Sequence, residues 1–224
     1  MLEQTAALIT AEGADVVRVH GEYDETVRTA AEYAEAHTDR ALVQDTAWDG
    51  YEQVPSWIVE GYATLLEEVD DTLGRAPDLV VVPVGVGSLA QAVVTYYRAP
   101  GRIGTRVLSV EPDSAACVLT SLSTGREASV PTEDTVMAGL NCGTVSSLAW
   151  PVLRDGCDAA VTVSDAEALR ASQDLDALGV SSGPCGAAPL AGVRAALHDA
   201  RRRAELDLPE DAVVVLLSTE GVTA

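Results

Sequence analysis

A glycine-rich turn between a predicted strand and a predicted helix is the part of this sequence best suited to bind an anion. The run Leu79 to Val84 is almost entirely aliphatic, which predicts a strand buried on both faces, as in a parallel sheet. Gly85-Val86-Gly87-Ser88 follows it and opens a predicted helix. Glycine permits a tight turn, and the first N–H groups of a helix lack intrahelical partners, so a phosphate could bind here. The turn is neither a P-loop nor a complete G-x-G-x-x-G, so a plain strand-to-helix connection is the alternative.

The elements around this turn alternate between helical and strand patterns. Strands are predicted over residues 15–19, 41–43, 79–84, 106–110, 159–163 and 212–217. Helices are predicted over 4–12, 24–37, from Pro55 to about 73, 114–122, 165–177 and 190–203. Ser164 and Glu167 form a capping box before one of them. This βα alternation predicts an α/β fold built on a parallel sheet.

Composition excludes several classes of function. There are 35 acidic and 14 basic residues, and a net charge of -21 argues against binding to nucleic acid. The chain has neither an apolar run long enough to cross a bilayer nor a recognisable signal peptide, which predicts a cytoplasmic protein without a membrane partner. The four cysteines lie far apart without a C-x-x-C pair, so we expect reduced thiols and no metal site. The acidic surface fits either a high-salt cytoplasm or an arginine-biased genome.

Five polar segments occur in an order typical of one enzyme family. They are Gln44-Asp45-Thr46-Ala47-Trp48-Asp49-Gly50-Tyr51, Gly85-Val86-Gly87-Ser88, Val110-Glu111-Pro112-Asp113, Met137-Ala138-Gly139-Leu140-Asn141-Cys142-Gly143 and Ser218-Thr219-Glu220-Gly221. With them, essentially the whole chain resembles the diaminopropionate ammonia-lyases, pyridoxal-phosphate enzymes of the tryptophan synthase β-like fold. The resemblance implies a three-layer α/β parallel-sheet fold with two domains. Residues 1–48 would be the remainder of the smaller domain, and residues 49–224 the larger, cofactor-binding domain.

The resemblance also implies a role for individual residues. The cofactor phosphate would bind at Gly85, Val86, Gly87, Ser88 and Leu89, in agreement with the anion site expected from the turn itself. Ser218 would lie next to the pyridine nitrogen of pyridoxal phosphate, which a neutral hydroxyl leaves unprotonated. Asp45 would act as an acid or base near the substrate amine, although an aspartate in a turn or helix cap is its plain alternative. Glu111 and Asp113 could contact substrate or simply close a strand.

The sequence differs from the family in one feature, because it contains no lysine. In this fold a lysine holds the cofactor as a Schiff base, so Met1 looks like a late start, and we expect an N-terminally truncated chain that is inactive alone. In full-length form the expected protein is a homodimer that converts 2,3-diaminopropionate, a small amino-acid substrate, to pyruvate and ammonia. The alternatives are a non-catalytic pyridoxal-phosphate-binding module, half of a split enzyme completed by a lysine-bearing chain, or a relative of the threonine and serine dehydratases.

Overall fold

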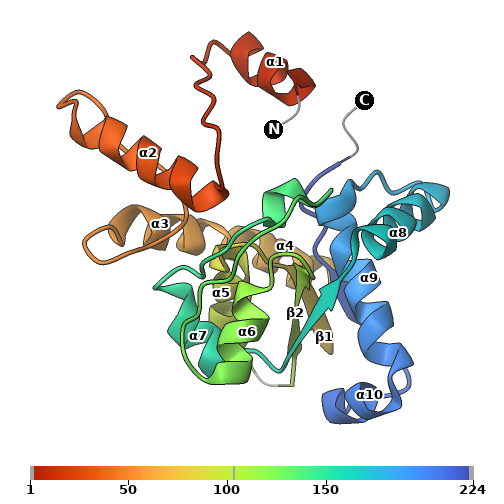
Figure 1. The fold of residues 1–224 in the computed structure, drawn as a ribbon. Coiled ribbons are helices and arrows are strands. Elements are labelled where there is room, and N and C mark those ends of the chain that lie inside the picture. Colours follow the sequence, from red (N-terminus) through yellow and green to blue (C-terminus); the bar gives the residue numbers. More distant parts are fainter. Residues whose placement is uncertain (1–2, 103, 222–224) are drawn as a thin grey trace. The chain divides into compact units, whose positions relative to one another are not determined.

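The computed structural model describes residues 3–102 and 104–221, and it divides them into two compact units (Figure 1). One unit contains residues 3–42, and the other contains residues 43–221 apart from residue 103. The domain boundary expected at residues 48 and 49 stays a prediction.

The first unit contains two helices, α1 (Glu3–Ala11) and α2 (Tyr23–Glu35), close to where helices are predicted. The strand predicted between them, over residues 15–19, is wrong, as is the one predicted over 41–43. Val17 is 75% exposed and Val43 is 71% exposed. Short β-branched runs suggested strands, but a strand needs a neighbour to receive its backbone hydrogen bonds, and neither segment pairs with one in the described chain.

The second unit is built on a four-stranded parallel sheet with the strand order β3-β2-β1-β4. The strands are β1 (Leu79–Pro83), β2 (Arg106–Pro112), β3 (Ala159–Val163) and β4 (Val214–Leu216). All five residues of β1 are buried, because this strand lies inside the sheet and both of its faces are covered. All four strands predicted in this part of the sequence are confirmed.

Helices cover both faces of this sheet, which confirms the three-layer α/β architecture (Figure 1). On one face Leu79 and Val81 pack with the helices α8 (Asp165–Ala177) and α9 (Pro184–His198). On the other, Val80 and Val82 pack with α4 (Ala63–Leu73), α5 (Ser88–Tyr97), α6 (Cys117–Thr124) and α7 (Ala149–Gly156). The alternation along β1 follows from the period of two of a strand.

Three predicted helices differ from the structure, and the simplest difference is that the helix expected over 114–122 begins only at Cys117. The helix expected after Pro55 divides at Tyr62 into α3 (Gln53–Gly61) and α4, with Pro55 in the first turn of α3. The helix expected over 190–203 begins instead at Pro184, because proline suits the first position of a helix. It ends at His198, where the Asp199 carboxylate accepts a 2.9 Å hydrogen bond from the Arg202 N–H and begins a separate helix, α10 (Ala200–Leu206).

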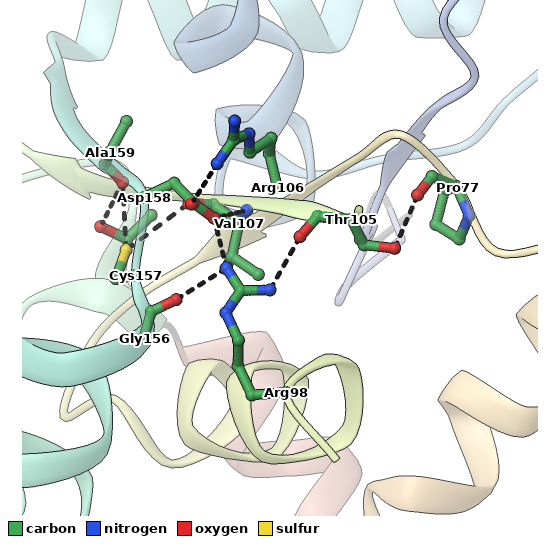
Figure 2. A network of polar contacts seen from close by, with 10 residues as sticks. Pro77, Arg98, Thr105, Arg106, Val107, Gly156, Cys157, Asp158 and Ala159 are labelled. Carbon is green, nitrogen blue, oxygen red and sulfur yellow. Dashed lines mark hydrogen bonds and ion pairs between the residues drawn. The ribbon is translucent and has the colours of Figure 1, made fainter. Parts of the chain in front are cut away.

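A network of polar contacts connects the end of α5 with the amino ends of β2 and β3, as Figure 2 shows. The guanidinium of Arg98, at the end of α5, donates to the carbonyl oxygens of Thr105 at 2.8 Å and Gly156 at 2.9 Å, and it forms an ion pair with Asp158. The Asp158 carboxylate also accepts the Val107 N–H at 2.7 Å. These contacts join α5, β2 and the start of β3 at one edge of the sheet. The loops at the opposite, carboxyl edge carry the candidate site.

Candidate functional site

The glycine turn joins β1 to α5 at the carboxyl edge of the sheet. Gly87 is the N-cap of α5 with φ of +97°, a left-handed conformation that favours glycine, and its carbonyl accepts the Gln91 N–H at 2.8 Å. Within the described part of the chain, the N–H groups of Gly87, Ser88 and Leu89 have no hydrogen-bond acceptor. Unpaired donors at the positive end of a helix are the arrangement that binds phosphate.

Close packing behind the turn leaves no room for larger side chains. A Cβ atom on Gly85 would lie 3.0 Å from the Cys142 sulfur and 3.2 Å from the Gly139 oxygen. A Cβ atom on Gly87 would lie 3.0 Å from Leu153 Cδ1. The loop of residues 137–143, which includes the short 3-10 helix η1 (Ala138–Leu140), therefore lies directly against the glycine turn. The Cys142 thiol is buried and serves packing here.

The segment of residues 44–51 folds into a compact loop that holds Asp45. The Gln44 side-chain oxygen accepts the Thr46 N–H at 2.6 Å, so the chain turns tightly at Asp45. The rings of Trp48 and Tyr51 stack with centroids 4.6 Å apart. The Ala47 N–H donates to the Ser146 hydroxyl at 2.9 Å and anchors the loop to the main body of the unit. Asp45 thereby lies at the bend of this loop, outside the helices and strands.

Asp45 and the glycine turn meet in a direct contact. The Ser88 hydroxyl donates a 2.5 Å hydrogen bond to Asp45 Oδ2, although the two residues are 43 positions apart in the sequence. Ser88 itself is buried. Burial and the nearby Asp45 carboxylate raise the pKa of Tyr62, whose hydroxyl also interacts with Ser88. Asp45, Tyr62 and Ser88 thus form one polar group at the start of α5, and the role of Asp45 as acid or base stays a prediction.

Ser218 comes two residues after the end of β4, the strand that lies beside β1. Leu216, the last residue of β4, pairs with Val81 in β1, so Ser218 lies beyond this pairing, on the side of the sheet where β1 leads into the glycine turn. The chain passes from β1 through α5 to β2 on one side of β1, whereas β4 lies on the other side. The direction in which successive strands are added therefore reverses between β1 and β4. Ligands of open α/β sheets bind at such a reversal, outside the carboxyl ends of the strands.

A second helix also begins at this edge, close to Ser218. The Ser182 hydroxyl lies 2.9 Å from the Ser218 hydroxyl, and Ser182 is completely buried. Glu220 Oε1 accepts the N–H of Cys185 in the first turn of α9 at 2.8 Å. Burial and the Glu220 carboxylate raise the pKa of the Cys185 thiol to about 12, which makes it a poor nucleophile.

Glu111, left open between a substrate contact and a structural role, proves to be structural. Its two carboxylate oxygens accept the N–H groups of Val118 and Leu119, each at 2.7 Å, in the first turn of α6. The residue is completely buried, and this desolvation raises its pKa to about 7. It fixes the end of β2 to α6. Asp113 is exposed, and its N–H donates to the Val163 oxygen at 3.0 Å, which closes the strand pair.

Comparison with known proteins identifies the family. A family model described as pyridoxal-phosphate dependent enzyme matches residues 2–220. The chain belongs to this family. A diaminopropionate ammonia-lyase from Escherichia coli K12 is 36% identical over 227 residues, which cover 94% of this chain and 56% of the relative. A biosynthetic L-threonine dehydratase from Mycobacterium leprae is 30% identical over 188 residues, which cover 81% of this chain and 42% of that relative.

A solved structure confirms the fold. It is that of diaminopropionate ammonia-lyase from Escherichia coli in complex with an aminoacrylate-PLP azomethine reaction intermediate. It superposes with a TM-score of 0.84 and 32% identity over 98% of this chain and 59% of that chain. The tryptophan synthase β-like fold expected from the resemblance is thus confirmed, and the expected cofactor is the one that gives the family its name. The chain spans somewhat over half the length of these ammonia-lyases.

The residues of this family member fit a phosphorylated cofactor. The unpaired N–H groups of Gly87, Ser88 and Leu89 suit the phosphate, and the neutral Ser218 hydroxyl is at the same sheet edge. The sequence pattern did not single out Ser182, Glu220 or Tyr62 as site residues. The segment Ser181-Ser182-Gly183-Pro184 offered a partial signal, since glycine and proline there mark a second helix start at this edge.

Proposed function

We propose that this chain contains the cofactor-binding and part of the substrate-binding machinery of a pyridoxal-phosphate-dependent ammonia-lyase that acts on 2,3-diaminopropionate. The observation that carries the proposal is the glycine turn at the start of α5, with its unpaired N–H groups and its direct contact to Asp45. The chain is 36% identical to a diaminopropionate ammonia-lyase and 30% identical to a threonine dehydratase. This difference supports 2,3-diaminopropionate as the substrate.

Each residue of the site has a task in this proposal. When bound, pyridoxal phosphate supplies an electron-withdrawing ring that stabilises negative charge at the α-carbon of an amino acid. The N–H groups of Gly87, Ser88 and Leu89 would hold its phosphate, and the Ser218 hydroxyl would donate to its pyridine nitrogen. The Asp45 carboxylate, oriented by the Ser88 hydroxyl, accepts a proton from the substrate or returns one to the leaving amine.

The 224 residues contain no lysine, so this proposal requires that the lysine that anchors the cofactor in this fold comes from elsewhere. We propose that it belongs to the same protein in a longer form, and that a second, lysine-bearing chain is the alternative. The homodimer and the cytoplasmic location expected from the sequence remain predictions. No helix in the described ranges 3–102 and 104–221 is long and apolar enough to cross a membrane.

The test is an assay of the protein isolated from its own source with an antibody against residues 200–217. We expect one pyruvate and two ammonia molecules per 2,3-diaminopropionate consumed, and a kcat/KM at least tenfold lower for L-threonine and L-serine. A preference for threonine, with 2-oxobutyrate as the product, would replace the ammonia-lyase with a dehydratase. The intact mass decides the origin of the lysine: a species above 23.3 kDa supports a longer protein, and one at 23.3 kDa supports a second chain.

A further inference from the structure

Ser182 is a buried hydroxyl to which neither the sequence nor the proposed function gives a role. It has no exposed surface, and its Oγ lies 2.9 Å from Ser218 Oγ. Its other oxygen neighbour is the carbonyl of Gly183, which is 3.5 Å away. A buried hydroxyl normally donates its proton, and Ser218 is much the better acceptor of the two. We infer that Ser182 donates to Ser218 and thereby leaves the Ser218 proton to point at the pyridine nitrogen of the bound cofactor.

The backbone around this pair holds both hydroxyls in place. The Gly183 N–H donates to the backbone carbonyl oxygen of Glu220 at 3.1 Å, and the Cys185 N–H donates to the Glu220 side-chain carboxylate at 2.8 Å. These two bonds join the loop before α9 to the segment after β4. A Cβ atom on Gly186 would lie 2.8 Å from Ser182 Oγ, from Ser218 Oγ and from the Glu220 oxygen. Only glycine fits at this position of α9, because any larger residue would press against both hydroxyls.

The direction of the hydrogen bond has a chemical consequence. A hydroxyl that accepts a hydrogen bond becomes a stronger donor, because the two bonds polarise each other. Ser218 is exposed and follows β4 at the carboxyl edge of the sheet, where the cofactor is proposed to bind, so a proton that is not donated to Ser182 is available to a ligand there. Ser182 is therefore a positioning residue that acts through Ser218. The inference rests on the proposed function, since it requires the pyridine nitrogen to lie beside Ser218.

The test compares two ligands on the full 224-residue chain. Pyridoxal phosphate has a pyridine nitrogen, whereas 1-deazapyridoxal phosphate has a C–H group in its place and accepts no hydrogen bond there. For S182A we expect binding of pyridoxal phosphate to weaken about 2- to 10-fold, the usual effect of one hydrogen bond. Binding of the deaza analogue should not change. S218A should show the same pattern, and the double variant S182A/S218A should be no weaker than S218A alone.

Ser172 provides a matched control. Its hydroxyl donates to the Ser182 carbonyl at 2.5 Å, so S172A removes a hydrogen bond from the same loop without removing a hydroxyl from the pair. We expect S172A to bind both ligands as the wild type does. If S182A weakens both ligands equally, or weakens neither, the positioning role is wrong while the proposed cofactor site stands. If the wild-type chain binds neither ligand, the cofactor site and this inference both fail.

Discussion

Replacing Gly87 with alanine should damage both the fold and the anion site, and the structure allows the size of the effect to be worked out. An L-residue at φ of +97° costs about 1–2 kcal/mol in backbone strain. The new Cβ atom would also lie 3.0 Å from Leu153 Cδ1 and 3.1 Å from the Ala149 Cβ, and overpacking of this kind costs about 1–3 kcal/mol. We therefore expect G87A to lower the free energy of unfolding by about 2–5 kcal/mol.

Gly74 offers the matched control for the backbone contribution. It ends α4 at φ of +67°, and a Cβ atom there would meet nothing within 4 Å. G74A should therefore cost only the left-handed strain, about 1 kcal/mol. Urea unfolding followed by tryptophan fluorescence measures both variants, and equal midpoints for G87A and G74A would refute the packing described here. G87A should also weaken binding of pyridoxal phosphate at least tenfold, whereas G74A should bind it normally.

Three further predictions concern other parts of the second unit. In a double-mutant cycle, D45A and S88A should show a coupling energy of about 1–3 kcal/mol in urea unfolding, because a charge-assisted hydrogen bond joins the two side chains; additive effects would contradict that contact. Burial raises the pKa of Glu111 from 4.5 to about 7, so the folded chain keeps a proton that the unfolded chain releases. The wild type should therefore lose about 2.5 kcal/mol of stability relative to E111Q between pH 5 and 8, and a constant difference across this range would argue against the raised pKa. L66A should lower the free energy of unfolding by about 2–5 kcal/mol, because Leu66 has no exposed surface. L65A, at a position that is 38% exposed, should lower it by less than about 1 kcal/mol. Similar losses for the two variants would mean that the orientation of α4 is wrong.

The sheet of the second unit could be predicted because its strands carry strong local signals. Leu79 to Val82 form an unbroken aliphatic run, and the structure buries every one of them. The failed strand over residues 15–19 shows the limit of such signals, because a β-branched run does not specify a partner strand. The division of the predicted helix at Tyr62 could not be predicted from this residue, because tyrosine is neither a proline nor a glycine. Gly61, directly before it, was the only local signal at this point.

The candidate site could be predicted where its residues are adjacent in sequence, as in the glycine turn. The contacts between distant residues could not. Ser88 and Asp45 are 43 positions apart, and Ser182 and Ser218 are 36 positions apart. Parallel strands bring their carboxyl ends to one edge, but which hydroxyls meet there depends on register and on the loop that each helix start adopts. That information becomes available only with the fold.

The most direct test of the central claim is the ³¹P NMR spectrum of pyridoxal phosphate bound to the full chain. A phosphate monoester in water titrates with a pKa of about 6, and N–H donors at a helix start favour its dianion. We predict that the ³¹P shift of the bound ligand stays constant between pH 5 and 8 and that pyridoxal, which lacks the phosphate, binds much more weakly. A bound phosphate that titrates like the free ester, or equal affinities for the two compounds, would contradict the assignment of the Gly85–Leu89 turn as the phosphate site.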